Sequence, residues 1–87
     1  MLRLTRIMTH VELNKLVAGA EQICRKLGTR GFIRCRGALE GQTGIIIYCF
    51  EDSASAGAFQ TGRQTVTRQF RVVILDATPN EVREYRP

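Results

Sequence analysis

Few side chains in this sequence could perform chemistry, and their spacing fits no common catalytic or metal site. The cysteines Cys24, Cys35 and Cys49 form neither a CxxC pair nor a set with zinc-ligand spacing. The single histidine, His10, has no serine or cysteine placed near it for activation as a nucleophile. No glycine pattern of the kind that cradles nucleotide phosphates occurs. We therefore expect no catalytic residue, no metal site, no cofactor and no enzymatic activity.

The cysteines are better explained as packing residues. Three is an odd number, which argues against a framework of disulfides. All three fall on apolar faces of the expected elements, where a free cysteine packs as a small hydrophobic residue. Buried thiols are thus the first interpretation, and a cross-strand bond between Cys35 and Cys49 under oxidising conditions is the alternative.

Arginine dominates the charged residues and gives the sequence its capacity for binding. The 87 residues carry a net charge of +5, from 13 basic and 8 acidic side chains, and all but two of the basic ones are arginine. The planar guanidinium suits phosphate, carboxylate and aromatic partners. A GC-rich genome would produce the same bias without any binding role, since arginine codons are GC-rich.

The segment from residue 32 to residue 51 predicts a β-hairpin, around which the other elements are arranged. Polar and apolar residues alternate along its first half, and its second half is rich in β-branched and aromatic residues. Glycines bracket the turn between them. A pairing of Glu40 with Gly44 places Cys35 opposite Cys49, on an apolar face that a helix would cover.

The same register predicts that the second face of the hairpin is basic and aromatic. Arg36 would lie opposite Tyr48 and Arg34 opposite Phe50, and a later strand would add Arg71. Phe59, in the segment after the hairpin, would either pin that segment to the core or face a partner. The candidate partner-binding residues are therefore Arg34, Arg36, Tyr48, Phe50, Phe59 and Arg71.

An amphipathic helix precedes the hairpin. Thr9 and Glu12 form a capping box, apolar residues recur at three- and four-residue spacing as far as Leu27, and Gly28 ends the helix. Residues 2–7 alternate as a short first strand.

The segments after the hairpin are less regular. Residues 52–64 are small and polar without periodicity, which predicts a long mobile loop. Residues 65–76 predict a long strand. The run from Thr78 through Pro79 to Glu81 predicts the start of a short C-terminal helix.

Together these elements predict a single α+β domain over residues 1–87. One amphipathic helix packs on a three- or four-stranded antiparallel sheet, in the order (β)-α-β-β-β-(short α). The α-β-β-β-α order resembles that of double-stranded-RNA-binding domains, but the basic motif that begins their second helix is missing, since Glu81 and Glu84 occupy that segment. No apolar run is long enough to cross a bilayer and no signal-peptide pattern occurs, so we expect a cytoplasmic protein without a membrane partner.

Binding is the function that these features favour. The first hypothesis is a small adaptor or inhibitor, of the kind that phages and mobile elements encode. It would occupy a site on a nucleic-acid-processing or host-defence complex through the basic and aromatic face. Its partner would be another protein or a second copy in a homodimer, because Tyr, Phe and Arg are enriched in interfaces. The alternative is an RNA- or single-stranded-nucleic-acid-binding domain, with bases stacked on the aromatic rings and arginines on phosphates.

Overall fold

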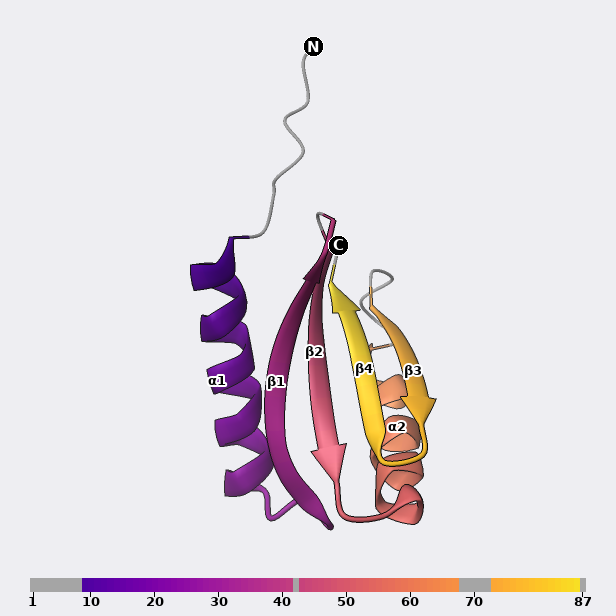
Figure 1. Ribbon diagram of the computed structural model, residues 1–87. Coiled ribbons are helices and arrows are strands. Elements are labelled where there is room, and N and C mark those ends of the chain that lie inside the picture. The colour runs from indigo at the N-terminus through magenta and orange to yellow at the C-terminus, as the bar shows by residue number, and fades with distance from the viewer. Residues whose placement is uncertain (1–8, 42, 68–72, 87) are drawn as a thin grey trace.

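Each helix of this domain is followed by a pair of strands. The computed structural model describes residues 9–41, 43–67 and 73–86. Its elements are, in order, α1 (His10–Lys26), β1 (Phe32–Glu40), β2 (Thr43–Phe50), α2 (Ser53–Thr67), β3 (Ile74–Thr78) and β4 (Glu81–Arg86). The strands form one antiparallel sheet in the order β1-β2-β4-β3 (Figure 1). The predicted α+β class is confirmed, with a second helix added.

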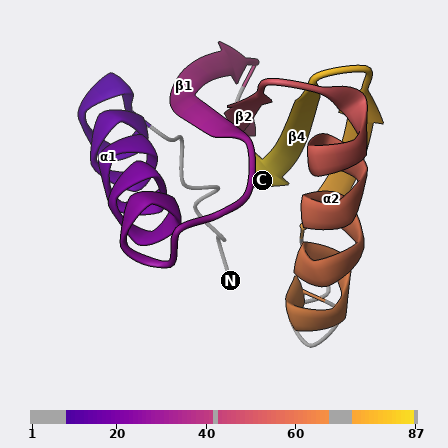
Figure 2. The same cartoon turned by 90° about the horizontal axis from the view of Figure 1, so that it is seen from below.

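Both helices lie on the same face of the sheet, which gives the domain two layers (Figure 2). α1 packs against β1 and β2, whereas α2 packs against β2, β3 and β4. The core fills the space between the layers, and its buried residues are Cys24, Cys35, Ile46, Tyr48, Phe50, Ala56 and Val82. In the described part of the chain, no helix covers the opposite face of the sheet.

α1 begins as its capping sequence predicts. The side-chain oxygen of Thr9 accepts a hydrogen bond of 3.1 Å from the backbone N–H of Glu12. Gly28 follows the helix in the left-handed region, with φ of 64°. Gly37 on β1 then allows α1 to approach the sheet closely. A Cβ at residue 37 would lie 2.8 Å from Cγ2 of Val17 and 3.0 Å from Cγ of Leu13.

α1 also satisfies backbone groups of β1, which is an edge strand. The carboxylate of Glu21 accepts a hydrogen bond of 2.9 Å from the backbone N–H of Cys35. The guanidinium of Arg25 donates one of 3.0 Å to the carbonyl of Ile33. Unpaired edge groups are a template for strand addition. The helix side chains therefore block strand addition along this part of β1.

The predicted register of the β1–β2 hairpin is wrong by one residue. Glu40 pairs with Thr43, not with Gly44. The turn is tighter than predicted, because Gly41 adopts a φ of 61° that closes it with two residues. A shift of one residue moves every side chain of a strand to the other face. The residues of β2 that face the helices are therefore Ile46, Tyr48 and Phe50.

The segment predicted as a mobile loop is α2, so the prediction for residues 52–64 is wrong. The carboxylate of Asp52 accepts a hydrogen bond of 2.7 Å from the backbone N–H of Ser55, which caps the helix. The side of α2 that packs on the sheet consists of Ser55 and Ala56 with Phe59. Small residues bury little apolar area, so this helix has no hydrophobic periodicity that the sequence would reveal.

The C-terminal segment is a hairpin, and the predicted C-terminal helix is wrong. Thr78 pairs with Glu81 across a two-residue turn. The backbone N–H of Phe50 holds that turn by a hydrogen bond of 2.8 Å to the carbonyl of Asn80. The predicted strand over 65–76 is only partly right, since residues 65–67 belong to α2 and residues 68–72 lie outside the described ones. The predicted first strand over 2–7 also lies outside them.

A buried carboxylate connects the second helix to the sheet. Glu84 of β4 is 0% exposed and faces the helices. Nε of Arg63 on α2 lies 2.7 Å from one of its oxygens, and Arg86 donates bonds of 2.9 and 2.8 Å to the other. Burial alone would raise the pKa of Glu84, but the hydrogen bonds from Arg63 and Arg86 outweigh it and lower the pKa. The folded protein therefore contains Glu84 as an ionised carboxylate that is held by two arginines.

Substitution of two glycines tests the packing of α1. Gly37→Val should lower the free energy of unfolding by about 1–3 kcal/mol, because the new side chain overlaps Val17 and Leu13. Gly19→Ala, in the middle of α1 with no atom within 4 Å of the new Cβ, should raise it by about 0.5–1 kcal/mol. Urea unfolding followed by circular dichroism measures both. Equal effects of the two substitutions would contradict the close approach at residue 37.

The lowered pKa of Glu84 predicts a loss of stability in acid. The contribution of the carboxylate is fully present above the pKa of an unfolded glutamate, about 4.3. It is lost as the pH falls through the lower pKa of the folded state. The free energy of unfolding between pH 5 and pH 2 should therefore fall more steeply for the wild type than for Glu84→Gln. Glu40→Gln, at an exposed position, is the matched control and should keep the wild-type slope.

Candidate functional site

The candidate site is the face of the sheet that points away from both helices, here called the open face. Strand pairing arranges its residues in rows across the sheet, each row running from β1 through β2 and β4 to β3. The first row is Arg34, Cys49, Glu81 and Thr78, the second is Arg36, Ile47, Arg83 and Asp76, and the third is Ala38, Ile45, Tyr85 and Ile74. Two rows are therefore charged, and one row is apolar.

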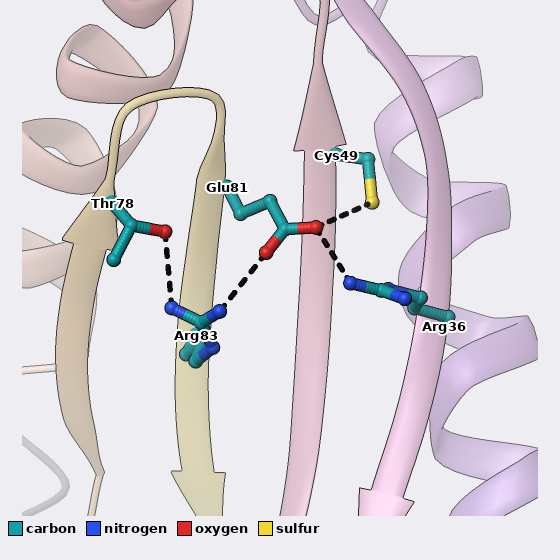
Figure 3. A network of polar contacts seen from close by, with 5 residues as sticks. All are labelled: Arg36, Cys49, Thr78, Glu81 and Arg83. Atoms are coloured by element: carbon teal, nitrogen blue, oxygen red, sulfur yellow. Dashed lines mark hydrogen bonds and ion pairs between the residues drawn. The ribbon is translucent and has the colours of Figure 1, made fainter.

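A polar network connects all four strands across the first two rows (Figure 3). The carboxylate of Glu81 accepts a hydrogen bond of 2.7 Å from Arg36 and one of 3.0 Å from Arg83. Arg83 also donates a bond of 3.0 Å to the hydroxyl of Thr78, and Sγ of Cys49 lies 3.9 Å from Glu81. Both oxygens of Glu81 are thus occupied. The network orders the charged side chains and leaves that carboxylate unsuited to act as a general base.

The isoleucines of β2 on this face are largely shielded by their row neighbours. Ile47 stands between Arg36 and Arg83, whose aliphatic stems flank it, and it is only 8% exposed. Ile45 stands between Ala38 and Tyr85 and is 5% exposed. At the β3 end of the apolar row, Ile74 is 67% exposed. The open face therefore has an ordered polar part and an exposed apolar edge.

The structure separates the residues that the sequence analysis had grouped together. Arg34 and Arg36 lie on the open face and are exposed. Tyr48 and Phe50 lie under the helices, each only 2% exposed. Phe59 of α2 packs on both rings, with centroid distances of 4.7 Å to Tyr48 and 5.1 Å to Phe50.

The basic and aromatic face, as predicted, is therefore not formed. The one-residue error in register caused this, because it assigned Tyr48 and Phe50 to the side of the arginines. Burial, with the nearby charge of Glu84, raises the pKa of the Tyr48 hydroxyl and keeps it protonated. The sixth candidate, Arg71, lies outside the described residues.

The sequence analysis missed Glu81, Arg83, Tyr85 and Ile74. The first three alternate with Val82 and Glu84 along β4, which is a period-two signal. The same segment also fits a helix start at Thr78 and Pro79, and this competing pattern led to the prediction of a helix. Ile74 lies in the segment 65–76, which the sequence predicts as one long strand.

Two cysteines form a buried pair in the core. Cys24 of α1 and Cys35 of β1 are both buried. A hydrogen bond from the Cys35 thiol, with a second from Thr29, lowers the pKa of Cys24 to about 7 and raises that of Cys35. Cys49 lies on the other face of the sheet, so the alternative of a Cys35–Cys49 bond is wrong. Cys24 is only 4% exposed, so its thiol lies inside the core.

Other classes of site find little support in the described ranges. No group of three or more His, Cys, Asp or Glu residues in them could hold a metal ion. Neither α1 nor α2, the helices of these ranges, has the length and apolarity that a membrane crossing requires. His10 is an exposed residue of the first turn of α1.

Thiol reactivity tests the positions of the three cysteines. In the native protein, 5,5′-dithiobis(2-nitrobenzoic acid) should react rapidly with Cys49 and should reach Cys24 and Cys35 only when the core opens. The rapid phase should be absent in Cys49→Ser. Rapid reaction of Cys24 in that variant would mean that its thiol is accessible, and would reopen a role for it as a nucleophile.

Comparisons with known proteins add no family or relative to this description. No protein-family model matches the chain, and neither a curated protein nor a solved structure matches it.

Proposed function

We propose that this chain is a non-enzymatic binding module that docks on another protein through its open face and acts by occupying that protein's surface. The observation that carries the proposal is the placement of both helices on one side of the sheet (Figure 2). This leaves four strands of ordered side chains uncovered by the rest of the described chain. Binding without a reaction is how small adaptors and inhibitors work, and the proposal includes that class.

The residues of the open face suit a protein surface. Tyr and Arg are enriched in protein interfaces, and Tyr85, Arg36 and Arg83 all lie on this face. Ion pairs to Glu81 already hold both arginines in place, which reduces the conformational entropy lost on binding. The exposed Ile74 adds an apolar anchor at the edge.

The balance of charge on the open face and the burial of the aromatic rings favour a protein partner over a nucleic acid. The three rows of the open face hold Arg34, Arg36 and Arg83 against Asp76 and Glu81, a nearly balanced set. A platform for bases needs exposed rings, and Tyr48, Phe50 and Phe59 pack on one another under α2.

Two isoleucine variants test this function. Ile74 on the open face and Ile23 on α1 are 67% and 59% exposed, so replacing either with glutamate should leave the fold intact. Tagged wild type, Ile74→Glu and Ile23→Glu are used to capture proteins from a lysate of the source cells, followed by quantitative mass spectrometry. A protein partner should be retained by the wild type and Ile23→Glu and lost from Ile74→Glu.

The same three proteins are titrated with fluorescent single-stranded and double-stranded oligonucleotides at low and high salt. Tight binding that falls steeply with salt would support the nucleic-acid alternative over the proposal. Protein capture that Ile74→Glu does not change would show that the open face is not the binding surface.

A further inference from the structure

The two edges of the open face carry opposite charge. Arg34 and Arg36 lie on β1, at one edge, and Asp76 lies on β3, at the other. Among the described residues, neither Arg34 nor Asp76 makes an ion pair or a hydrogen bond through its side chain. Arg83, which pairs with Asp76 across the strands, directs its guanidinium to Glu81 and Thr78. Within the described ranges, each edge therefore presents an unpaired charge.

We propose that the partner on the open face is a second copy of this chain, related by a twofold axis parallel to the strands and located between β2 and β4. This rests on the proposed function and identifies the protein that occupies the face. Rotation about such an axis keeps each residue in its row and places β1 opposite β3 of the partner subunit. The interface is isologous, so each contact occurs twice.

This arrangement pairs charge with opposite charge and large side chains with small ones. Arg36 lies opposite Asp76 of the partner subunit, and Arg34, one row away, has the length to reach it. In the apolar row, Ala38 faces the exposed Ile74 of the partner subunit, and Ile45 faces its Tyr85. The small side chain of Ala38 leaves room for the larger isoleucine at each edge.

The other face-to-face arrangement is unfavourable. An axis in the plane of the interface but perpendicular to the strands would place β1 opposite β1 of the partner subunit. Arg34 and Arg36 of the two copies would then approach one another, and like charges facing across an interface cost several kcal/mol. The same axis would set the apolar row against charged rows. The distribution of charge therefore selects the axis parallel to the strands.

The area of the open face indicates the size class of the proposed dimer interface. Four strands about 4.8 Å apart, each contributing about six residues at about 3.4 Å, cover roughly 400 Å². Stable interfaces bury about 800 Å² on each partner, so this dimer belongs to the weak class. Because two ion pairs contribute, the dimer should weaken as salt is raised.

Variants that exchange the charges of the two edges test the inference. Sedimentation equilibrium from about 1 to 500 μM measures the dissociation constant of the wild type, Asp76→Arg, Arg34→Glu and the double variant. Asp76→Arg should raise the dissociation constant at least about tenfold, because the new side chain would face two arginines of the partner subunit. The double variant should bind more tightly than Asp76→Arg alone, since the exchanged charges pair again, although Arg36 still faces a like charge. Lys26→Glu, which repeats the charge change of Arg34→Glu on exposed α1, should have no effect.

Three outcomes would overturn the inference. A wild type that stays monomeric over the whole concentration range would show that the partner is not a second copy. In that case the proposed function still holds if Ile74→Glu abolishes capture of a different protein. A dimer that neither Asp76→Arg nor Arg34→Glu weakens uses another surface. A double variant as weak as Asp76→Arg alone contradicts the pairing of the two edges. Circular dichroism of each variant confirms that the fold is retained, and Asp76→Asn provides a milder replacement if Asp76→Arg does not fold.

Discussion

The register of the β1–β2 hairpin is the constraint on which the rest of the structure depends. Pairing Glu40 with Thr43 assigns Tyr48 and Phe50 to the face that the helices cover. Since side chains alternate strictly along a strand, a slip of one residue would place the aromatic rings of β2 on the same face as the arginines of β1. Such a slip would also remove the rings on which Phe59 packs. The hairpin turn at Gly41 therefore decides which surface is core and which is free to bind.

The second layer is held by contacts that differ between its two helices. α1 lies close to β1 because Gly37 has no side chain, and its Glu21 and Arg25 also satisfy backbone groups of that strand. α2 offers little apolar area and instead combines one ring, Phe59, with the ion pair from Arg63 to buried Glu84. A buried carboxylate is stable here only because two guanidinium groups compensate for its lost hydration. The position of α2 thus depends on specific polar contacts as much as on hydrophobic burial.

These two layers separate an enclosed pair of thiols from the exposed side chains of the open face. Cys24 and Cys35 are enclosed between helix and sheet, whereas Cys49 lies on the open face, and the carboxylate of Glu81 is hydrogen-bonded to Arg36 and Arg83. These ion pairs order the charged side chains of the open face. An ordered surface with mixed charges and an exposed apolar edge supports the proposed role in binding. The opposite charge at its two edges is the observation from which we propose pairing with a second copy.

The sequence by itself determined the elements whose signals are local. Thr9 and Gly28 bound an apolar stripe that predicts α1, and the hairpin follows from alternation around glycines, so the α+β class could be derived from the residues alone. Tertiary structure decided the register, the helical state of residues 53–67 and the C-terminal hairpin. Each of these depends on a partner that is distant in sequence: Phe50 for the turn at Asn80, Tyr48 for Phe59, and Arg63 for Glu84. The open face was therefore beyond local prediction, because its residues are assembled only when those long-range contacts form.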